Sequence, residues 1–372
     1  MFMSKYIIFH LPYKIDPNKP SASQIRPVRL INAFKNRGFE VDIVMGNSSD
    51  RKRQIKDIKR NIKSGRKYEF LYSESSTMPT LLTDSHHLPL EPLLDFSFFK
   101  FCKEQSIPIG LFYRDMHWKF PFYNKDASTF KKLIARVFYK YDLVKYRSLV
   151  DVLFLPSVEM AEYLPELKNL KIKELPPGLI IPEKYENLKM QKSTNILYVG
   201  GLSSDIYDIS LFAKVIERHK NIKLTICCRQ YDLNALTDDV KNQLTKVDNI
   251  RIVHESGDGL LKLYQETDIC SLFLKPIEYW KFAMPAKLFE YISFLKPIIS
   301  IKNTKAGKYV QENHLGWEVN HTEEDLDNLL TLISRNKNIL PQEFHSSLMN
   351  SRQSNTWESR VDYINHSLTI ND

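Results

Sequence analysis

The chain has 372 residues, of which 43% are hydrophobic, 12% aromatic and 26% charged, and this composition excludes an intrinsically disordered protein. The length suits two domains rather than one core, and the four cysteines lack the spacing of a zinc site or a disulfide framework. The net charge of +9 is uneven: residues 1–182 hold 30 Lys+Arg and 19 Asp+Glu, whereas the remainder holds 23 and 25, so the first half offers a basic surface that attracts phosphate.

Strand-like apolar runs alternate with helical patterns through the first half of the chain. We expect strands at 6–9, 41–45, 68–72, 107–113 and 151–156, and helices at 26–38, 50–64, about 92–105 and 126–147. Strands that alternate with helices imply a parallel sheet with helices on both faces. The pattern breaks near residues 174–194, where three prolines and many polar residues predict a linker.

A second series of strands and helices follows the linker. We expect strands at 195–201, 222–228, 251–255, 269–274 and 297–301, a further strand at GWEV, and helices at 206–219, 259–266, 322–334 and about 343–368. The prediction is an α/β protein with two Rossmann-like domains that face each other across a cleft. They span residues 1–178 and 195–341, joined by a linker at 179–194 and followed by a C-terminal helix at 342–372 able to cross back to the first domain. Ligands of such folds bind beyond the carboxyl ends of the strands.

One short stretch combines opposite charges with a buried-looking helix and strand, AMPAKLFEYISFLKPIIS at 283–300. Pro285 suits the first turn of a helix, where free N–H groups attract phosphate. Lys287 adds a cation there, and Glu290, one turn on, can accept hydrogen bonds from the two hydroxyls of a ribose. This combination suits a nucleoside diphosphate. The alternative is a surface Lys–Glu pair three residues apart.

The same stretch resembles the donor-binding signature of GT-B glycosyltransferases, of the group 1 and family-4-like type, and of glucuronosyltransferase- and teichuronic-acid-type polysaccharide enzymes. Further segments resemble this fold in order, and together they cover most of residues 195–368: NILYVGGLSSDIYDISLF, NIRIVHESGDGLLKLYQETDICSLFLKP and SNTWESRVDYI. The resemblance implies a GT-B fold with a nucleotide-sugar-binding C-terminal domain and an acceptor-binding N-terminal domain. Residue 282, eight before Glu290, is Phe where family-4 enzymes carry a second glutamate, so retention or inversion of configuration stays open.

Carried over by position, the resemblance assigns five donor-binding residues. Glu290 would bind the donor ribose and Lys287 the diphosphate. Gly200 and Gly201 would let the loop approach the donor closely, and Arg229 would reach the donor.

A second candidate site follows the strand in GLFYRDMHWKFPFY, residues 110–123. An inverting transfer needs a base that takes the proton of the acceptor hydroxyl, and we expect Asp115 in this role with His117 as the second choice. Arg114 and Trp118 would face the acceptor or a membrane. The alternative is that Arg114 pairs with Asp115 while His117 and Trp118 pack in the fold. Closure of the domains about residues 176–194 would bring Asp115 toward the donor.

A basic run, RKRQIKDIKRNIKSGRK at 51–67, holds nine basic residues and one acidic, with isoleucines at helical spacing. It predicts an amphipathic helix that contacts anionic lipid or the acceptor. The residues expected there are Arg51, Lys52, Arg53, Lys59 and Arg60. A solvated helix face is the alternative.

The sequence thus predicts a metal-independent glycosyltransferase of bacterial surface polysaccharide synthesis, of the hexosyltransferase type. Its donor would be a nucleotide diphosphate sugar, with UDP favoured, its acceptor a lipid-linked glycan, and no cofactor, metal or nucleic acid is expected. The first 13 residues lack a signal-peptide pattern, so we expect a cytoplasmic protein, peripheral on the inner face of the cell membrane. The alternatives are a nucleotide-sugar epimerase of the same fold and a basic nucleic-acid-binding protein.

Overall fold

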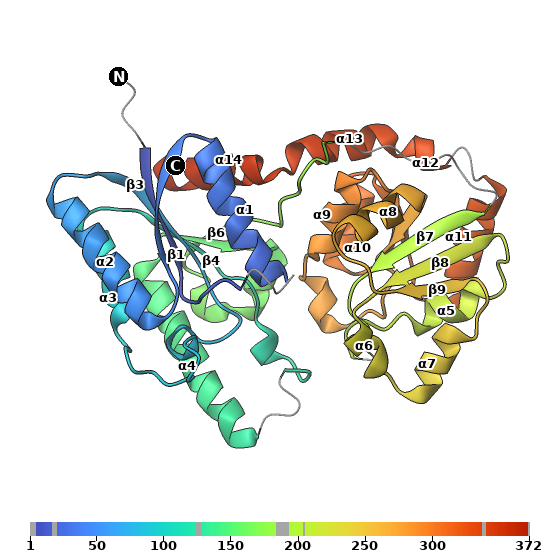
Figure 1. Ribbon diagram of the computed structural model, residues 1–372, viewed down its shortest axis with the longest axis horizontal. Coiled ribbons are helices and arrows are strands. Elements are labelled where there is room, and N and C mark those ends of the chain that lie inside the picture. Colours follow the sequence, from blue (N-terminus) through green and yellow to red (C-terminus); the bar gives the residue numbers. More distant parts are fainter. Residues whose placement is uncertain are drawn as a thin grey trace. The chain divides into compact units, whose positions relative to one another are not determined.

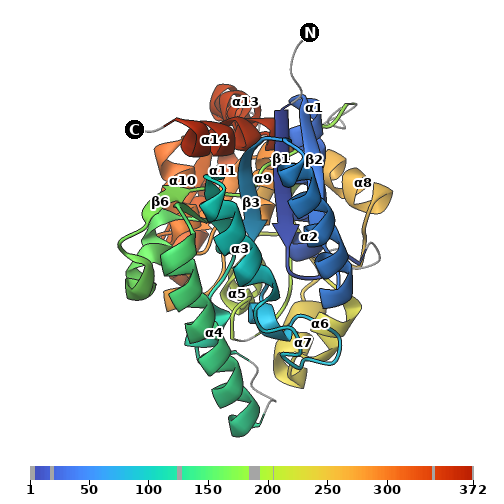
Figure 2. The ribbon, with the colours of Figure 1, turned by 90° about the vertical axis from the view of Figure 1, so that its left-hand side faces the viewer.

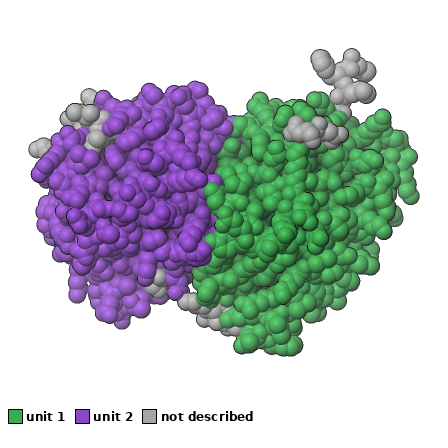
Figure 3. Space-filling model, turned by 180° about the vertical axis from the view of Figure 1, so that it is seen from behind, with its two compact units in different colours: residues 1–177, 357–372 green, residues 178–356 purple. Residues whose placement is uncertain are grey.

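The computed structural model describes residues 5–16, 21–123, 128–183, 193–203, 205–336 and 340–370. The chain divides into two compact units (Figures 1 and 3): unit 1 is residues 1–177 with 357–372, and unit 2 is residues 178–356. Each unit holds a six-stranded sheet whose described pairings are all parallel. The predicted α/β fold with two Rossmann-like halves is confirmed. Within the described ranges, no helix has the length and apolarity needed to cross a membrane.

Unit 1 has the strand order β2-β1-β3-β4-β5-β6. Its strands are β1 (Lys5–Leu11), β2 (Phe39–Met45), β3 (Tyr68–Glu74), β4 (Ile109–Phe112), β5 (Val152–Leu155) and β6 (Lys171–Glu174). Its helices are α1 (Ala22–Asn36), α2 (Ser48–Lys63), α3 (Leu94–Glu104), α4 (Thr129–Leu149) and α14 (Trp357–Thr369), with short 3-10 turns η1 (Thr80–Leu82), η2 (His117–Lys119), η3 (Val158–Tyr163) and η4 (Pro165–Leu167).

Two helix layers cover the sheet of unit 1. Helices α1 and α14 share an apolar cluster with one face of β1, which includes Phe9, Phe34 and Val361. Helices α2, α3 and α4 cover the opposite face (Figure 2). Gly110 of β4 permits the close approach of α14, because a methyl group there would lie 2.8 Å from the Leu368 side chain. The segment expected as one helix at 343–368 is broken, since α14 begins after a bend at residues 355–356.

Unit 2 has the strand order β12-β11-β10-β7-β8-β9. Its strands are β7 (Thr194–Val199), β8 (Ile222–Cys227), β9 (Ile250–Val253), β10 (Ile269–Ser271), β11 (Ile298–Ile301) and β12 (Gly316–Val319). Its helices are α5 (Ser210–Ile216), α6 (Gln230–Asn234), α7 (Asp238–Thr245), α8 (Asp258–Glu266), α9 (Ala286–Ser293), α10 (Lys305–Glu312), α11 (Glu323–Arg335), α12 (Leu340–Glu343) and α13 (His345–Ser354), with a 3-10 turn η5 (Glu278–Lys281).

The core of unit 2 fixes the position of α9. Leu288 and Ile292 of this helix lie in one apolar cluster with Leu197 of β7 and with residues of α8, α10 and α13. All strands are parallel, so the loops that follow β7, β8 and β9 emerge at one edge of the sheet. Of the predicted linker at 179–194, residues 184–192 lie outside the described residues.

Candidate functional site

The first two turns of α9 present two charged side chains that pair with each other. Lys287 Nζ lies 2.5 Å from Glu290 Oε2, and the Tyr264 hydroxyl donates a hydrogen bond of 2.9 Å to Glu290 Oε1. Tyr264 is fully buried and stacks on Phe294 with ring centroids 4.1 Å apart. About a third of the Lys287 and Glu290 side chains is exposed (32% and 30%). The buried Tyr264 hydroxyl therefore fixes Glu290, while both charged groups remain accessible to a ligand.

A tyrosine ties this helix to the end of β7. The backbone N–H of Val199 donates to the Tyr291 hydroxyl at 3.0 Å, and that hydroxyl donates to the Ser271 carbonyl oxygen at 3.3 Å. The glycine loop begins at the next residue. A methyl group at Gly200 would lie 2.6 Å from the Tyr198 hydroxyl, which itself donates to the Gly201 carbonyl at 2.7 Å. The loop therefore has room for glycine at position 200 and for no larger residue without a shift of Tyr198.

Arg229 adds a second cation at the same edge, directly after β8. Its guanidinium donates two hydrogen bonds to Asp232, at 2.9 and 3.2 Å, which raise the Arg229 pKa, and it lies over the Tyr231 ring. Asp232 Oδ2 would be 3.7 Å from a methyl group at Gly201, so Arg229 is held beside the glycine loop. Burial raises the pKa of the Cys227 thiol at the end of β8, and the Lys287 ammonium is among the groups that oppose that rise.

The structure thus gathers all five predicted donor-binding residues at the carboxyl edge of the unit 2 sheet. Sequence reasoning missed Tyr264, Tyr291 and Asp232, which position them. Among the described residues, no group of three or more His, Cys, Asp or Glu side chains could hold a metal ion.

In unit 1, Asp115 and His117 form a pair just beyond the end of β4. Asp115 Oδ2 lies 3.1 Å from His117 Nε2, and Asp115 Oδ1 accepts a 2.6 Å hydrogen bond from the Met116 N–H. The imidazole packs edge-on against the Phe122 ring, and 37% of its side chain is exposed. A carboxylate that orients an exposed imidazole is an arrangement suited to proton transfer.

Arg114 pairs with Glu74, at the end of β3, instead of Asp115. Arg114 Nη2 donates to Glu74 Oε2 at 2.7 Å, and Arg26 Nε donates to Glu74 Oε1 at 2.8 Å. Arg114 Nη2 also donates to the Tyr13 hydroxyl at 3.0 Å. Burial raises the Tyr13 pKa to about 12, although the positive charge of Arg114 lowers it. Glu74 is fully buried and neutralises one of its two arginine partners, so this three-residue charge cluster keeps a net positive charge.

The prediction that Trp118 faces the acceptor or a membrane is wrong. Trp118 is 5% exposed and stacks on Tyr139 with centroids 4.9 Å apart and planes at 6°. Its indole N–H donates to the Tyr113 hydroxyl at 3.1 Å. The ring therefore supports the loop that carries Asp115 from within the fold.

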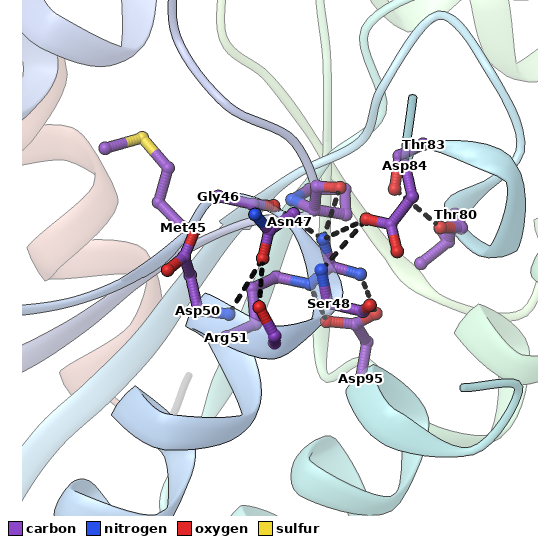
Figure 4. Close-up of polar contacts among 12 residues, drawn as sticks. Met45, Gly46, Asn47, Ser48, Asp50, Arg51, Thr80, Thr83, Asp84 and Asp95 are labelled. Atoms are coloured by element: carbon purple, nitrogen blue, oxygen red, sulfur yellow. Dashed lines mark hydrogen bonds and ion pairs between the residues drawn. The ribbon is translucent and has the colours of Figure 1, made fainter. Parts of the chain in front are cut away.

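The placement of Arg51 on an exposed basic face is wrong as well. Arg51 is 3% exposed, and its guanidinium donates to both oxygens of Asp95, at 3.0 and 3.1 Å (Figure 4). It also donates to the carbonyl oxygens of Pro12 and Gly46, at 2.9 and 2.7 Å. This side chain holds together the loops that follow β1 and β2. Ile55 and Ile58 of α2 also face the core.

The four other basic residues predicted on α2 lie outside the core. Lys52, Arg53 and Arg60 are exposed, and the Lys59 ammonium lies over the Phe101 ring at 4.8 Å. Their contact with an acceptor or a lipid stays a prediction.

No protein-family model matches the chain, and no curated protein matches its sequence. Solved structures with the same fold cover almost the whole chain at low identity. A glycosyltransferase from Rickettsia africae superposes with TM-score 0.66 and 13% identity, covering 99% of this chain and all of its own. Sucrose-phosphate synthase from Thermosynechococcus elongatus gives TM-score 0.65 and 10% identity, with 98% of both chains covered. Anabaena HepE, solved with UDP and glucose, gives TM-score 0.63 and 9% identity, covering 98% of this chain and 99% of its own.

The fold is also shared with a structure described as a UDP-N-acetylglucosamine 2-epimerase from Listeria monocytogenes. Here the TM-score is 0.51 and the identity 10%, and the match covers 97% of this chain and 95% of the other. The similarities establish the GT-B fold that the sequence resemblance implied. At these identities they show the fold alone.

Proposed function

We propose that this chain is a glycosyltransferase that moves a sugar from a UDP-sugar to a hydroxyl group of a glycan. The observation that carries the proposal is the arrangement at the edge of the unit 2 sheet. Lys287 and Glu290 pair on α9, and Tyr291 of the same helix accepts a hydrogen bond from Val199, directly before the Gly200–Gly201 loop. A nucleoside diphosphate needs cations and N–H groups at its phosphates and hydrogen-bond acceptors at its ribose. HepE has this fold and binds UDP, which supports UDP as the nucleotide.

Different residues of unit 2 bind different parts of the nucleotide. Glu290 keeps unused lone pairs on both carboxylate oxygens for the ribose hydroxyls. Lys287 and the first N–H groups of α9 offset the negative charge that grows on the leaving diphosphate, without a metal ion. Arg229, held by Asp232, supplies a further cation beside the glycine loop.

The transfer needs a base for the acceptor. The acceptor oxygen bonds to the anomeric carbon as its proton passes to Asp115, and the bond from that carbon to UDP breaks with its electron pair on the phosphate oxygen. His117 is the second candidate, in which case Asp115 orients the imidazole and stabilises its protonated form. This chemistry serves an inverting transfer.

The proposed acceptor is a lipid-linked glycan of bacterial surface polysaccharide. The excess of basic residues in the first half of the chain supports an acceptor with a pyrophosphate linkage. The positive charge left on the Arg26–Glu74–Arg114 cluster, next to the Asp115 loop, supports it too.

A sugar epimerase is the second candidate, because the Listeria epimerase shares the fold. The two functions differ in what they require. A transferase releases UDP when acceptor is present, whereas an epimerase converts the UDP-sugar without an acceptor.

Thermal unfolding with 1 mM UDP, GDP, dTDP or CMP tests the proposal. A ligand that binds the folded state stabilises it by RT ln(1 + [L]/Kd), so a micromolar site gives roughly 4 kcal/mol at a thousandfold excess. We expect a clear upward shift with UDP and a smaller one in Glu290→Ala. If none of the four nucleotides shifts the transition, the Lys287–Glu290 pair is structural and the proposal fails.

A further inference from the structure

Helix α4 is apolar on two opposite faces. One face packs into unit 1 through Tyr139, Leu143 and Tyr146, which are at most 4% exposed. Successive residues of a helix are turned by about 100°, and this rotation places a second apolar stripe on the far side. Its members are strongly exposed: Phe130 71%, Leu133 61%, Ile134 37%, Val137 58% and Val144 63%.

Basic residues border this exposed stripe on both sides. By the same rotation, Lys131 and Lys145 flank one edge, and Arg136, Lys140 and Arg147 flank the other. The one acidic residue of the helix, Asp142, is buried on the opposite face. The exposed half of α4 therefore has cations around an apolar strip and no carboxylate.

The position of α4 makes this face accessible within unit 1. Figures 1 and 2 show its first turns extending beyond the rest of the unit, and residues 128–131 are all exposed. Scattered single apolar residues on a surface need no explanation, but a row along one helix face marks a contact surface.

Helix α2, unlike α4, has no exposed row of apolar side chains that could insert into a membrane. Its Ile55 and Ile58 are buried against the sheet, so its exposed face has charge without apolar anchors. Three of its exposed cations are also paired with acidic residues: Lys52 with Glu91 at 2.7 Å, Arg53 with Asp50 at 3.5 Å and Arg60 with Asp57 at 2.8 Å.

We propose that the exposed face of α4 docks unit 1 on an anionic membrane surface. The apolar side chains of the stripe enter the boundary between headgroups and acyl chains, and the flanking lysines and arginines extend to the lipid phosphates. The charge complementarity favours lipid over a second copy of the chain, because two copies would bring these cations together. The contact fits the lipid-linked acceptor proposed above, but it rests on α4 and does not require the transfer reaction.

Insertion is measured with an environment-sensitive NBD fluorophore on Val137→Cys. The four native cysteines are all buried, so labelling is selective. Vesicles of phosphatidylcholine with 30% phosphatidylglycerol should raise the emission several-fold and shift it to the blue, and pure phosphatidylcholine should do so weakly. The same label on Lys52→Cys of α2 is the matched control and should change little. An unchanged signal at Val137 with anionic vesicles would overturn the proposal.

Binding strength is measured by co-sedimentation with the same vesicles. Leu133→Gln with Val137→Gln should weaken binding at least tenfold, and Arg136→Gln with Lys140→Gln roughly tenfold at low salt. The matched α2 pair, Lys52→Gln with Arg53→Gln, should weaken it less than threefold.

Three results would contradict the assignment of α4. The first is wild-type protein that remains in the supernatant with anionic vesicles. The second is an α2 pair that loses as much binding as the α4 pairs, and the third is a wild-type dimer that forms through α4 in place of vesicle binding. The UDP-induced thermal shift is recorded for every variant. A retained shift shows that the variant is folded and separates a failure of membrane docking from a failure of the proposed function.

Discussion

Replacing Glu290 with alanine should weaken UDP binding roughly tenfold to thirtyfold. The carboxylate is fixed by Lys287 at 2.5 Å and by the Tyr264 hydroxyl at 2.9 Å, and its remaining lone pairs would accept the ribose hydroxyls. A hydrogen bond to a charged group is worth about 1.5–3 kcal/mol. The lower part of this range applies because 30% of the side chain is exposed. A loss of about 1.5–2 kcal/mol corresponds to a factor of roughly 10–30 in Kd.

Isothermal titration calorimetry with UDP provides the measurement. Glu290→Gln keeps an acceptor for Tyr264 and removes the charge, so its affinity should fall between those of the wild type and Glu290→Ala. Glu312→Ala is the matched control, because Glu312 pairs with Lys308 on α10 of the same unit at 3.8 Å and is well exposed. A wild-type Kd in Glu290→Ala, or an equal loss in Glu312→Ala, would refute the reasoning.

Three further predictions follow from single contacts. Asp115→Asn should lower the rate of sugar transfer about 10²- to 10⁴-fold while UDP affinity is kept, and near wild-type turnover would remove Asp115 from the chemistry. Gly200→Ala should weaken UDP binding at least threefold by displacing the Tyr198 hydroxyl, which a methyl group would approach to 2.6 Å, and an unchanged Kd by calorimetry would show that the glycine is not needed. Burial raises the pKa of Asp142 from 3.8 to about 7, so the folded state binds the proton more tightly than the unfolded chain and loses stability as pH rises from about 4 to 7. Asp142→Asn, which can still accept the hydrogen bond from the Thr80 N–H, should abolish this pH dependence of the free energy of unfolding, which is roughly 3 kcal/mol between pH 5 and pH 8. Urea unfolding at these two pH values checks it, and equal pH slopes in both proteins would contradict it.

The sheets could be predicted because parallel strands are buried on both faces and read as apolar runs. The expected strands at 41–45 and 68–72 are β2 and β3. The edge strand β6 could not be predicted, since its sequence KIKE is polar and partly exposed. The bend at residues 355–356 was missed because the helical pattern continues across it.

The candidate site was predictable where its residues are close in sequence, as Lys287 and Glu290 are. Its supports were not, because Tyr264 precedes Glu290 by 26 residues and Glu74 precedes Arg114 by 40. Periodicity also cannot tell which basic residue of a helix faces inward. For this reason Arg51 was expected on the surface. Its guanidinium instead donates hydrogen bonds to Asp95 and to two backbone carbonyl oxygens.

Hydrogen–deuterium exchange with and without saturating UDP tests the central claim most directly, because it reports binding and location together. The account predicts slower exchange at the Gly200–Gly201 loop, at residues 228–232 and in the first turn of α9. Unchanged exchange throughout the chain, or protection confined to unit 1, would contradict the assignment of the nucleotide site to unit 2.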